Sequence, residues 1–194
     1  MTSHGGFSPG EGQSGVFNPF CGIDAADILL SGDIVGSKRA SGKGVILLAD
    51  GSRFEGDLFG AEAIGEGELV FTTGMTGFQE SLSDPSFAGQ VLTFTWPLLG
   101  NYGVAEGISE SSGVWPRGVV CREWIDHPDH RDCIGSVDDF LLAHGVPGIT
   151  SVDTRALTRR VREHGVILCQ FGPLEMEEEM RSRLEKMTSP DLED

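Results

Sequence analysis

Two cysteines and two histidines lie close together in the chain and have the residue types of a metal site. They are Cys121, His127, His130 and Cys133. Two thiolates and two imidazoles suit tetrahedral zinc. Structural zinc sites, however, usually have a tight Cys pair and a tight His pair joined by a longer loop. Because aspartates alternate with these residues as in a solvated loop, we predict no metal, with a small zinc-binding domain as the alternative.

Arg155, Arg159 and Arg162 form a second group with possible chemistry. Residues four and seven positions apart share one face of a helix. The sequence has 14 Lys and Arg against 30 Asp and Glu, a formal net charge of −16, so this basic stripe is an exception. One interpretation is a solvated face, with the later arginines favoured near the helix C-terminus. The other is a surface for an acidic partner, and the residues alone leave both open.

The patterns of self-contained catalysis are absent from the sequence. There is no phosphate-binding Gly-rich loop, no dinucleotide-binding glycine pattern after a strand and no nucleophile elbow. Cys21 lies in a Gly- and Ser-rich segment, whereas Cys121 and Cys169 fall in expected strands. We therefore predict no catalytic residue and no cofactor site in this chain.

The composition excludes several classes of protein. The acidic charge disfavours nucleic acids and anionic membranes as partners, because both are polyanions. No run approaches the ~18 apolar residues that would indicate a transmembrane helix. Four scattered cysteines in 194 residues do not make a disulfide framework. We expect a soluble protein of a reducing compartment, the cytoplasm.

The elements that would position these residues begin after a Gly- and Ser-rich extension, residues 1–44, which we expect to be mobile because it has little apolar surface to bury. Thr76 is expected to cap a short helix, with Gln79 at capping-box spacing. In this half of the chain, strands are expected at 45–48, 53–59, 68–72, 91–95 and 118–121, the first two joined by a tight Asp50-Gly51 turn.

The second half alternates helices with extended segments. Ser136 predicts the start of a helix that runs to His144, and Asp153 predicts the start of another that runs to Glu163. The remaining expected elements are extended segments at 146–152 and 166–171 and a highly charged helix at 174–187. Short strands followed by alternation predict an α/β fold with a mixed sheet and helices on one side.

Several sequence blocks carry a resemblance to a known family. In chain order they are LADGSRFEG (48–56), GMTGFQE (74–80), DPSFAGQ (84–90), VLTFTWP (91–97), GNYG (100–103), HGVPGI (144–149) and DTRALTR (153–159). Together they resemble the N-terminal domain of the small subunit of glutamine-dependent carbamoyl-phosphate synthase, over residues 45–172. Thr72, where the family usually has Asn, and the segment 127–133 depart from the family pattern.

The resemblance implies a β/β/α swivelling-type domain that docks on a large synthetase subunit, where both ATP sites and their Mg²⁺ are expected. The complete enzyme would make carbamoyl phosphate from glutamine, bicarbonate and two ATP, for arginine and pyrimidine biosynthesis. The Cys-His-Glu glutaminase machinery would lie in a C-terminal amidotransferase domain. Residues 173–194 are expected to form an acidic helix leading toward that domain, which we expect to be missing, so that the chain alone would be inactive.

The resemblance also implies a role for one hydroxyl. The serine of the family's Asp-Pro-Ser block lines the glutamine pocket, and it matches Ser86. A hydroxyl both donates and accepts, which suits either the α-amino or the carboxylate group of glutamine. The alternative for Ser86 is a turn residue alone. For the whole chain the alternative is a non-catalytic assembly module or an inactive fragment, with the arginines Arg155, Arg159 and Arg162 contacting the large subunit.

Overall fold

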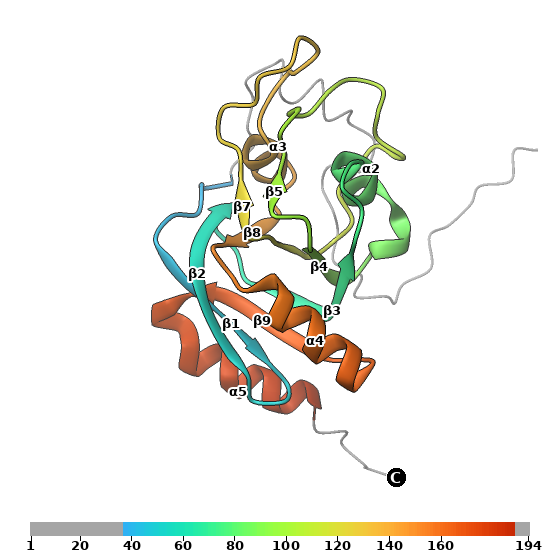
Figure 1. Cartoon of the computed structure of the whole chain (residues 1–194). Helices are drawn as coiled ribbons and strands as arrows, with labels where there is room; N and C mark the ends of the chain where they lie inside the picture. Colours follow the sequence, from blue (N-terminus) through green and yellow to red (C-terminus); the bar gives the residue numbers. More distant parts are fainter. Residues whose placement is uncertain (1–36, 189–194) are drawn as a thin grey trace, which may run out of the picture.

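The computed structural model describes residues 37–188 (Figure 1). Most of the extension expected at 1–44 lies outside the described residues. The part that is described, 37–44, packs onto the domain: Ala40 is buried and its N–H donates to the carbonyl of Gly60 at 2.8 Å. Arg39 forms ion pairs with Asp138 and Asp139. The packed domain therefore begins before residue 45.

Seven strands close into a barrel. Around the barrel they are β1 (Lys43–Leu48), β2 (Arg53–Gly60), β8 (Pro147–Thr150), β6 (Gly118–Val120), β4 (Gln90–Phe94), β3 (Gly65–Thr72) and β9 (Leu168–Pro173). The pairs β8–β6, β6–β4 and β4–β3 are parallel, and the other four are antiparallel. The predicted mixed α/β fold is thus confirmed, whereas closure of the sheet was not predicted.

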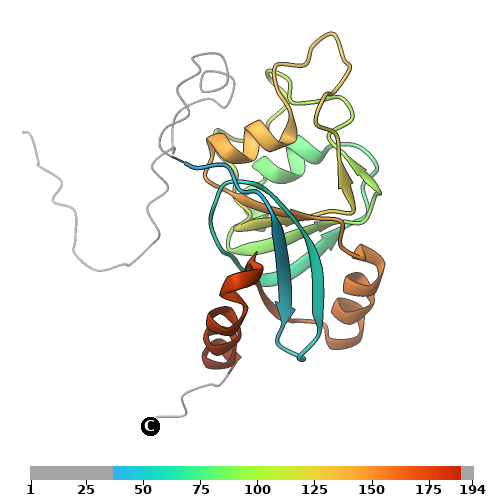
Figure 2. The ribbon, with the colours of Figure 1, turned by 90° about the vertical axis from the view of Figure 1, so that its left-hand side faces the viewer.

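The helices surround the barrel, so the expected arrangement with helices on one side is wrong. The helix α4 (Thr154–His164) contacts β3 and β4, whereas α5 (Glu177–Thr188) contacts β9 and β1. Figure 2 shows these two helices on opposite sides of the β1–β2 hairpin. At the other end lie α2 (Phe78–Ser83) and α3 (Val137–Ala143), near a two-stranded parallel sheet, β5 (Leu98–Leu99) with β7 (Glu123–Trp124). Because a closed sheet has an outer surface all round, its apolar outward positions need cover on several sides.

The interior of the barrel is shaped by one aromatic ring and two glycines. Phe171 of β9 is completely buried among the apolar side chains of the barrel strands and α4. A Cβ on Gly65 would lie 2.1 Å from the Phe171 ring, and a Cβ on Gly118 would lie 2.4 Å from it. Glycine at these two positions therefore makes room for the ring.

Most predicted caps are confirmed. Ser136 and Asp139 form a complete capping box at the start of α3, and the Asp153 carboxylate accepts from the N–H of Ala156 at the start of α4. The cap predicted at Thr76 is wrong. The residue before α2 is Gly77, with a left-handed φ of 79° and no side-chain cap. Gln79 turns instead into the protein interior, where main-chain groups of a distant loop satisfy its amide.

Two short 3-10 helices complete the described elements, η1 (Pro85–Phe87) and η2 (Leu174–Met176). The highly charged last helix predicted at 174–187 is confirmed as η2 followed by α5. Among the residues that the structure describes, no helix has the length and apolar character needed to cross a bilayer.

Candidate functional site

Ser86 lies on η1, directly after α2, and its main chain is held by Asp84. The Asp84 carboxylate accepts a hydrogen bond from the N–H of Ser86 at 2.8 Å and so caps η1. The Ser86 side chain is exposed, and its hydroxyl makes no hydrogen bond with any other described residue. Asp84 therefore stabilises the turn, and it leaves the Ser86 hydroxyl without a hydrogen-bond partner among residues 37–188.

A buried polar network anchors the helix that leads into this turn. Gln79 is only 4% exposed; its Nε2 donates to the carbonyl of Ala105 at 2.8 Å, and its Oε1 accepts from the N–H of the same residue at 2.9 Å. One turn later, Ser83 donates to the carbonyl of Gln79 at 2.7 Å and accepts from the N–H of Glu110 at 2.8 Å. These hydrogen bonds hold the loop that follows β5 against α2.

The buried polar network extends from Ser83 to the indole of Trp115. Ser111 donates to the carbonyl of Ser83 at 2.6 Å, and Trp115 Nε1 donates to the Ser111 hydroxyl at 2.7 Å. Sequence reasoning missed this network and read the polar residues before Gln90 as caps and turns. A usable signal was the spacing of Gln79 and Ser83, which lie four apart and so share one face of α2.

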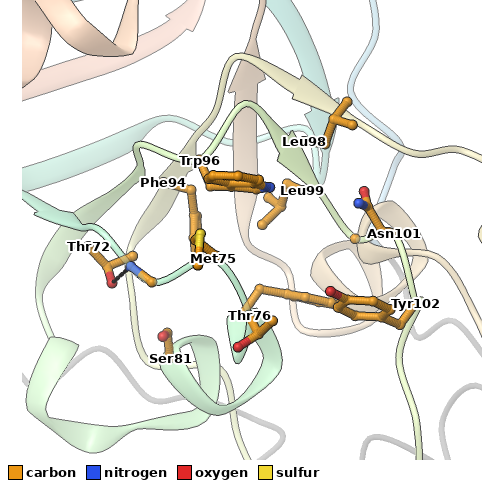
Figure 3. Close-up of a pocket in the computed structure, with 13 residues that line it drawn as sticks. Thr72, Met75, Thr76, Ser81, Phe94, Trp96, Leu98, Leu99, Asn101 and Tyr102 are labelled. Atoms are coloured by element: carbon orange, nitrogen blue, oxygen red, sulfur yellow. Dashed lines mark hydrogen bonds between the residues drawn. The ribbon is translucent and has the colours of Figure 1, made fainter.

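A cavity on the other side of α2 has a wholly uncharged lining. Met75, Trp96 and Tyr102 surround it and are 64%, 42% and 47% exposed, while Phe94 and Leu99 are buried beneath (Figure 3). Met75 comes from the β3–α2 loop, Phe94 from the end of β4, and the other three from the segment that follows β4. Ser86 is not among the lining residues, so this uncharged cavity and the Ser86 hydroxyl are separate features.

The three arginines of α4 lie together, as their spacing predicts. With five other residues they line a groove of about 350 Å³ between α4 and the ends of β3 and β4, which we name the arginine groove. The five others are Phe71, Thr73, Thr95, Thr154 and Thr158. The guanidinium of Arg162 lies 6.0 Å from the centre of the Phe71 ring. The far wall comes from strands distant in sequence, and sequence reasoning did not identify it.

The four residues considered for zinc do not come together as a metal site. Cys121 is fully buried, and desolvation raises its pKa to about 12. His127 and His130 are exposed beside aspartates, and the Cys133 thiol donates to the carbonyl of Gly135. Within residues 37–188, no group of three or more His, Cys, Asp or Glu side chains could hold a metal ion.

Two of the cysteines are also unsuited to nucleophilic catalysis. Like Cys121, Cys169 is fully buried, and desolvation raises its pKa well above the ordinary value. The reactive form of cysteine is the thiolate, which both sites strongly disfavour. Cys21 lies outside the described residues.

Comparison with known proteins identifies similar sequences. The model of a protein family described as "Carbamoyl-phosphate synthase small chain, CPSase domain" matches residues 46–171. The carbamoyl phosphate synthase small chain of Streptococcus agalactiae serotype III (strain NEM316) is 49% identical over 125 residues, 64% of this chain and 35% of the relative. The protein of the same name from Pyrobaculum aerophilum is 49% identical over 126 residues, 65% of this chain and 36% of the relative.

The match thus spans about a third of the length of these curated relatives. Among solved structures, an aminopeptidase from Aneurinibacillus sp. strain AM-1 aligns with a TM-score of 0.40 at 14% identity, over 76% of this chain and 36% of that one. This degree of similarity bears on neither fold nor function.

Proposed function

This chain belongs to the carbamoyl-phosphate synthase small-chain family, and we propose that it serves as the small-subunit portion of a glutamine-hydrolysing carbamoyl-phosphate synthase. The proposed reaction uses glutamine, bicarbonate and two ATP to form carbamoyl phosphate for arginine and pyrimidine synthesis in the cytoplasm. The family match over residues 46–171 is the observation that carries this proposal. Under this proposal, the barrel corresponds to the family's swivelling-type domain, and a separate large chain binds ATP and Mg²⁺.

The proposed contribution of this chain to glutamine binding is the Ser86 hydroxyl. It can donate to the carboxylate of glutamine or accept from the α-ammonium group. Asp84 holds the Ser86 main chain, and the buried network of Gln79 and Ser83 holds the preceding helix. The main chain that carries the hydroxyl is thereby positioned before glutamine arrives, which reduces the entropy lost on binding.

Hydrolysis of the glutamine amide needs a thiolate nucleophile and a nearby base. Burial holds Cys121 and Cys169 in the thiol form, and, following the family resemblance, we assign the nucleophile to the amidotransferase domain of the assembled enzyme. Ammonia released there would pass to the large chain, where carbamoyl phosphate is made. The role of this chain would then be to complete the glutamine pocket and to dock on the large chain.

A second candidate function is assembly alone, without a contribution to the glutamine pocket. The arginines of the arginine groove favour it: they form no ion pair with any described residue, and they offer a docking surface whether or not Ser86 binds a ligand. In both functions we propose that Arg155, Arg159 and Arg162 contact the large chain.

The test is reconstitution of the enzyme with and without this chain. The large chain and an amidotransferase domain are combined, and carbamoyl phosphate formation is measured with glutamine and, separately, with ammonium chloride. We expect this chain to raise the glutamine-dependent rate and to leave the ammonia-dependent rate almost unchanged. An unchanged glutamine-dependent rate would contradict the proposed function, and stable association without any rate effect would support assembly alone.

A further inference from the structure

We infer that the arginine groove binds a short acidic segment of the large chain, with carboxylates spread over about 10 Å and one apolar side chain set against Phe71. The inference rests on the docking role proposed above and adds the chemistry of the partner. Four features of the groove support it: unbalanced charge, the position of one arginine, free hydroxyls and length.

The charge of the groove is not balanced within the described residues. Neither Arg155 nor Arg159 forms an ion pair there, although both side chains are exposed. Their neighbour Arg160 differs, since it pairs with Asp50 at 3.7 Å and with Glu163 at 3.9 Å. Among residues 37–188, no Asp or Glu lines the groove, although the net charge of the sequence is −16. Guanidinium groups bind carboxylates through paired, charge-assisted hydrogen bonds.

The position of Arg155 is not explained by the stability of α4. Arg155 is the second residue of the helix, close to the positive end of the helix dipole, where a cation is disfavoured. Arg162, in the last turn, is favoured there by the same dipole. The carboxylate of Asp153, two positions before Arg155 in the chain, accepts from the N–H of Ala156 through its Oδ1. A bound carboxylate would offset the repulsion between Arg155 and the helix N-terminus.

Two hydroxyls in the groove have no partner within the described residues. Thr154 is only 4% exposed, and its hydroxyl makes no hydrogen bond with another described residue. Thr73 is exposed, and its hydroxyl makes none with a described residue either. The other two threonines, by contrast, donate to main-chain carbonyls. A carboxylate oxygen bound in the groove could accept a hydrogen bond from either hydroxyl. The half-buried Phe71 ring gives the same groove an apolar wall.

The length of the basic surface indicates the size of the partner segment. Arg155 and Arg162 are seven residues apart on α4, about 10 Å at the helical rise of 1.5 Å per residue. About three residues of an extended segment, or two helical turns, cover the same length. A nucleic acid would need a longer basic surface and a chain less negative than this one. A short acidic protein segment therefore fits best.

The first experiment measures binding of the full chain to the purified large synthase chain at 50 and 300 mM NaCl. We expect the double variant Arg155→Glu/Arg159→Glu to raise the Kd at least about 30-fold at low salt. The matched control, Arg160→Glu, should change the Kd less than about 3-fold, because Arg160 is paired within its own chain. The Kd of the unmodified chain should rise with salt, since screening weakens exposed pairs.

The second experiment identifies the partner group. In the Arg159→Lys variant a carbodiimide can activate a partner carboxylate, which the lysine amine then attacks to form an amide as the urea departs. We expect a cross-link to an Asp or Glu of the large chain, and none from the control variant Arg160→Lys. If the groove variants do not change the Kd and no such cross-link forms, this inference is wrong, but the proposed docking role is not affected. Lack of any binding by the unmodified chain would overturn the docking role itself.

A third measurement distinguishes a protein segment from a small anion. Inorganic phosphate at 5 mM, with ionic strength held constant, is added to the complex. We expect no displacement of the large chain. Displacement would assign the groove to a small phosphate-bearing ligand and would overturn the inference.

Discussion

Arg53, at the start of β2, holds Glu177, the first residue of α5, through a forked ion pair. Arg53 Nε lies 2.9 Å from Glu177 Oε1, and one terminal nitrogen lies 3.0 Å from Oε2. Arg181 adds a further contact with Glu177 at 2.9 Å. The pair therefore ties the last helix to the first hairpin of the barrel.

This pair predicts acid-sensitive docking of α5. The hydrogen bonds from Arg53, followed by those from Arg181, lower the pKa of Glu177 below its ordinary value of 4.5. The stabilising effect is therefore fully present above pH 4.5 and is lost as the pH falls through the lower folded-state pKa. Hydrogen-exchange protection of α5 amides should fall over that acidic range. In Glu177→Gln, protection should be lower at pH 7 and should change less with pH; equal pH profiles for the two proteins would contradict the prediction.

Ser86→Ala should weaken the use of glutamine in the assembled enzyme. Loss of a hydrogen bond to a buried ligand group costs roughly 1–3 kcal/mol, which corresponds to roughly a 5- to 150-fold higher KM for glutamine. The ammonia-dependent rate should not change, because ammonia bypasses the glutamine pocket. Ser112→Ala is the matched control, since Ser112 is also exposed on a loop. A KM for glutamine equal to that of the Ser112→Ala control would show that Ser86 does not bind glutamine.

Gln79→Ala should destabilise the fold and loosen the turn that carries Ser86. The substitution leaves both the N–H and the carbonyl of the buried Ala105 without their partner. We expect a loss of about 2 kcal/mol in the free energy of unfolding, measured by urea titration. Gln90→Ala serves as the control, because its long 3.4 Å contact with Glu68 is only partly buried. If the free energy of unfolding falls equally in the two variants, the network around Gln79 does not stabilise the fold more than the Gln90 contact does.

Gly118→Ala should be destabilising because of the Phe171 ring, and a smaller side chain at 171 should compensate. A methyl group at Gly118 overlaps the ring, and overpacking of a core costs typically 1–3 kcal/mol. The Phe171→Leu single variant loses packing, but in the double variant the two effects should partly cancel. A double-mutant cycle with purely additive changes in unfolding free energy would contradict the predicted contact.

The parts of the fold that could be predicted from the sequence are those that neighbouring residues determine. Ser136 and Asp139 cap α3 because both partners of the capping box lie within one turn. Thr76 and Gln79 have a capping-box spacing too, but the Gln79 amide gains two buried hydrogen bonds with Ala105, 26 positions away. Tertiary contacts thus override the local pattern at α2.

Barrel closure and the walls of the site could not be predicted in this way. Closure depends on pairing of β1 with β9, which joins residues more than 120 positions apart, and no local pattern specifies that register. Helical periodicity did place the three arginines on one face, but across the groove Phe71 lies in β3 and Thr73 directly follows that strand. For Ser86, the residues alone allowed only a turn, and a ligand role entered through family resemblance. That role stays a prediction.

Antiparallel pairing of the first and last barrel strands has one more consequence. Gly44 of β1 lies directly opposite Pro173 of β9, so the polypeptide enters and leaves the barrel at the same corner. β9 also pairs with β3, so it completes the ring between two strands that the chain forms much earlier. Joining segments so far apart in the chain costs entropy before their contacts form, so we expect closure of the barrel to be a late step of folding.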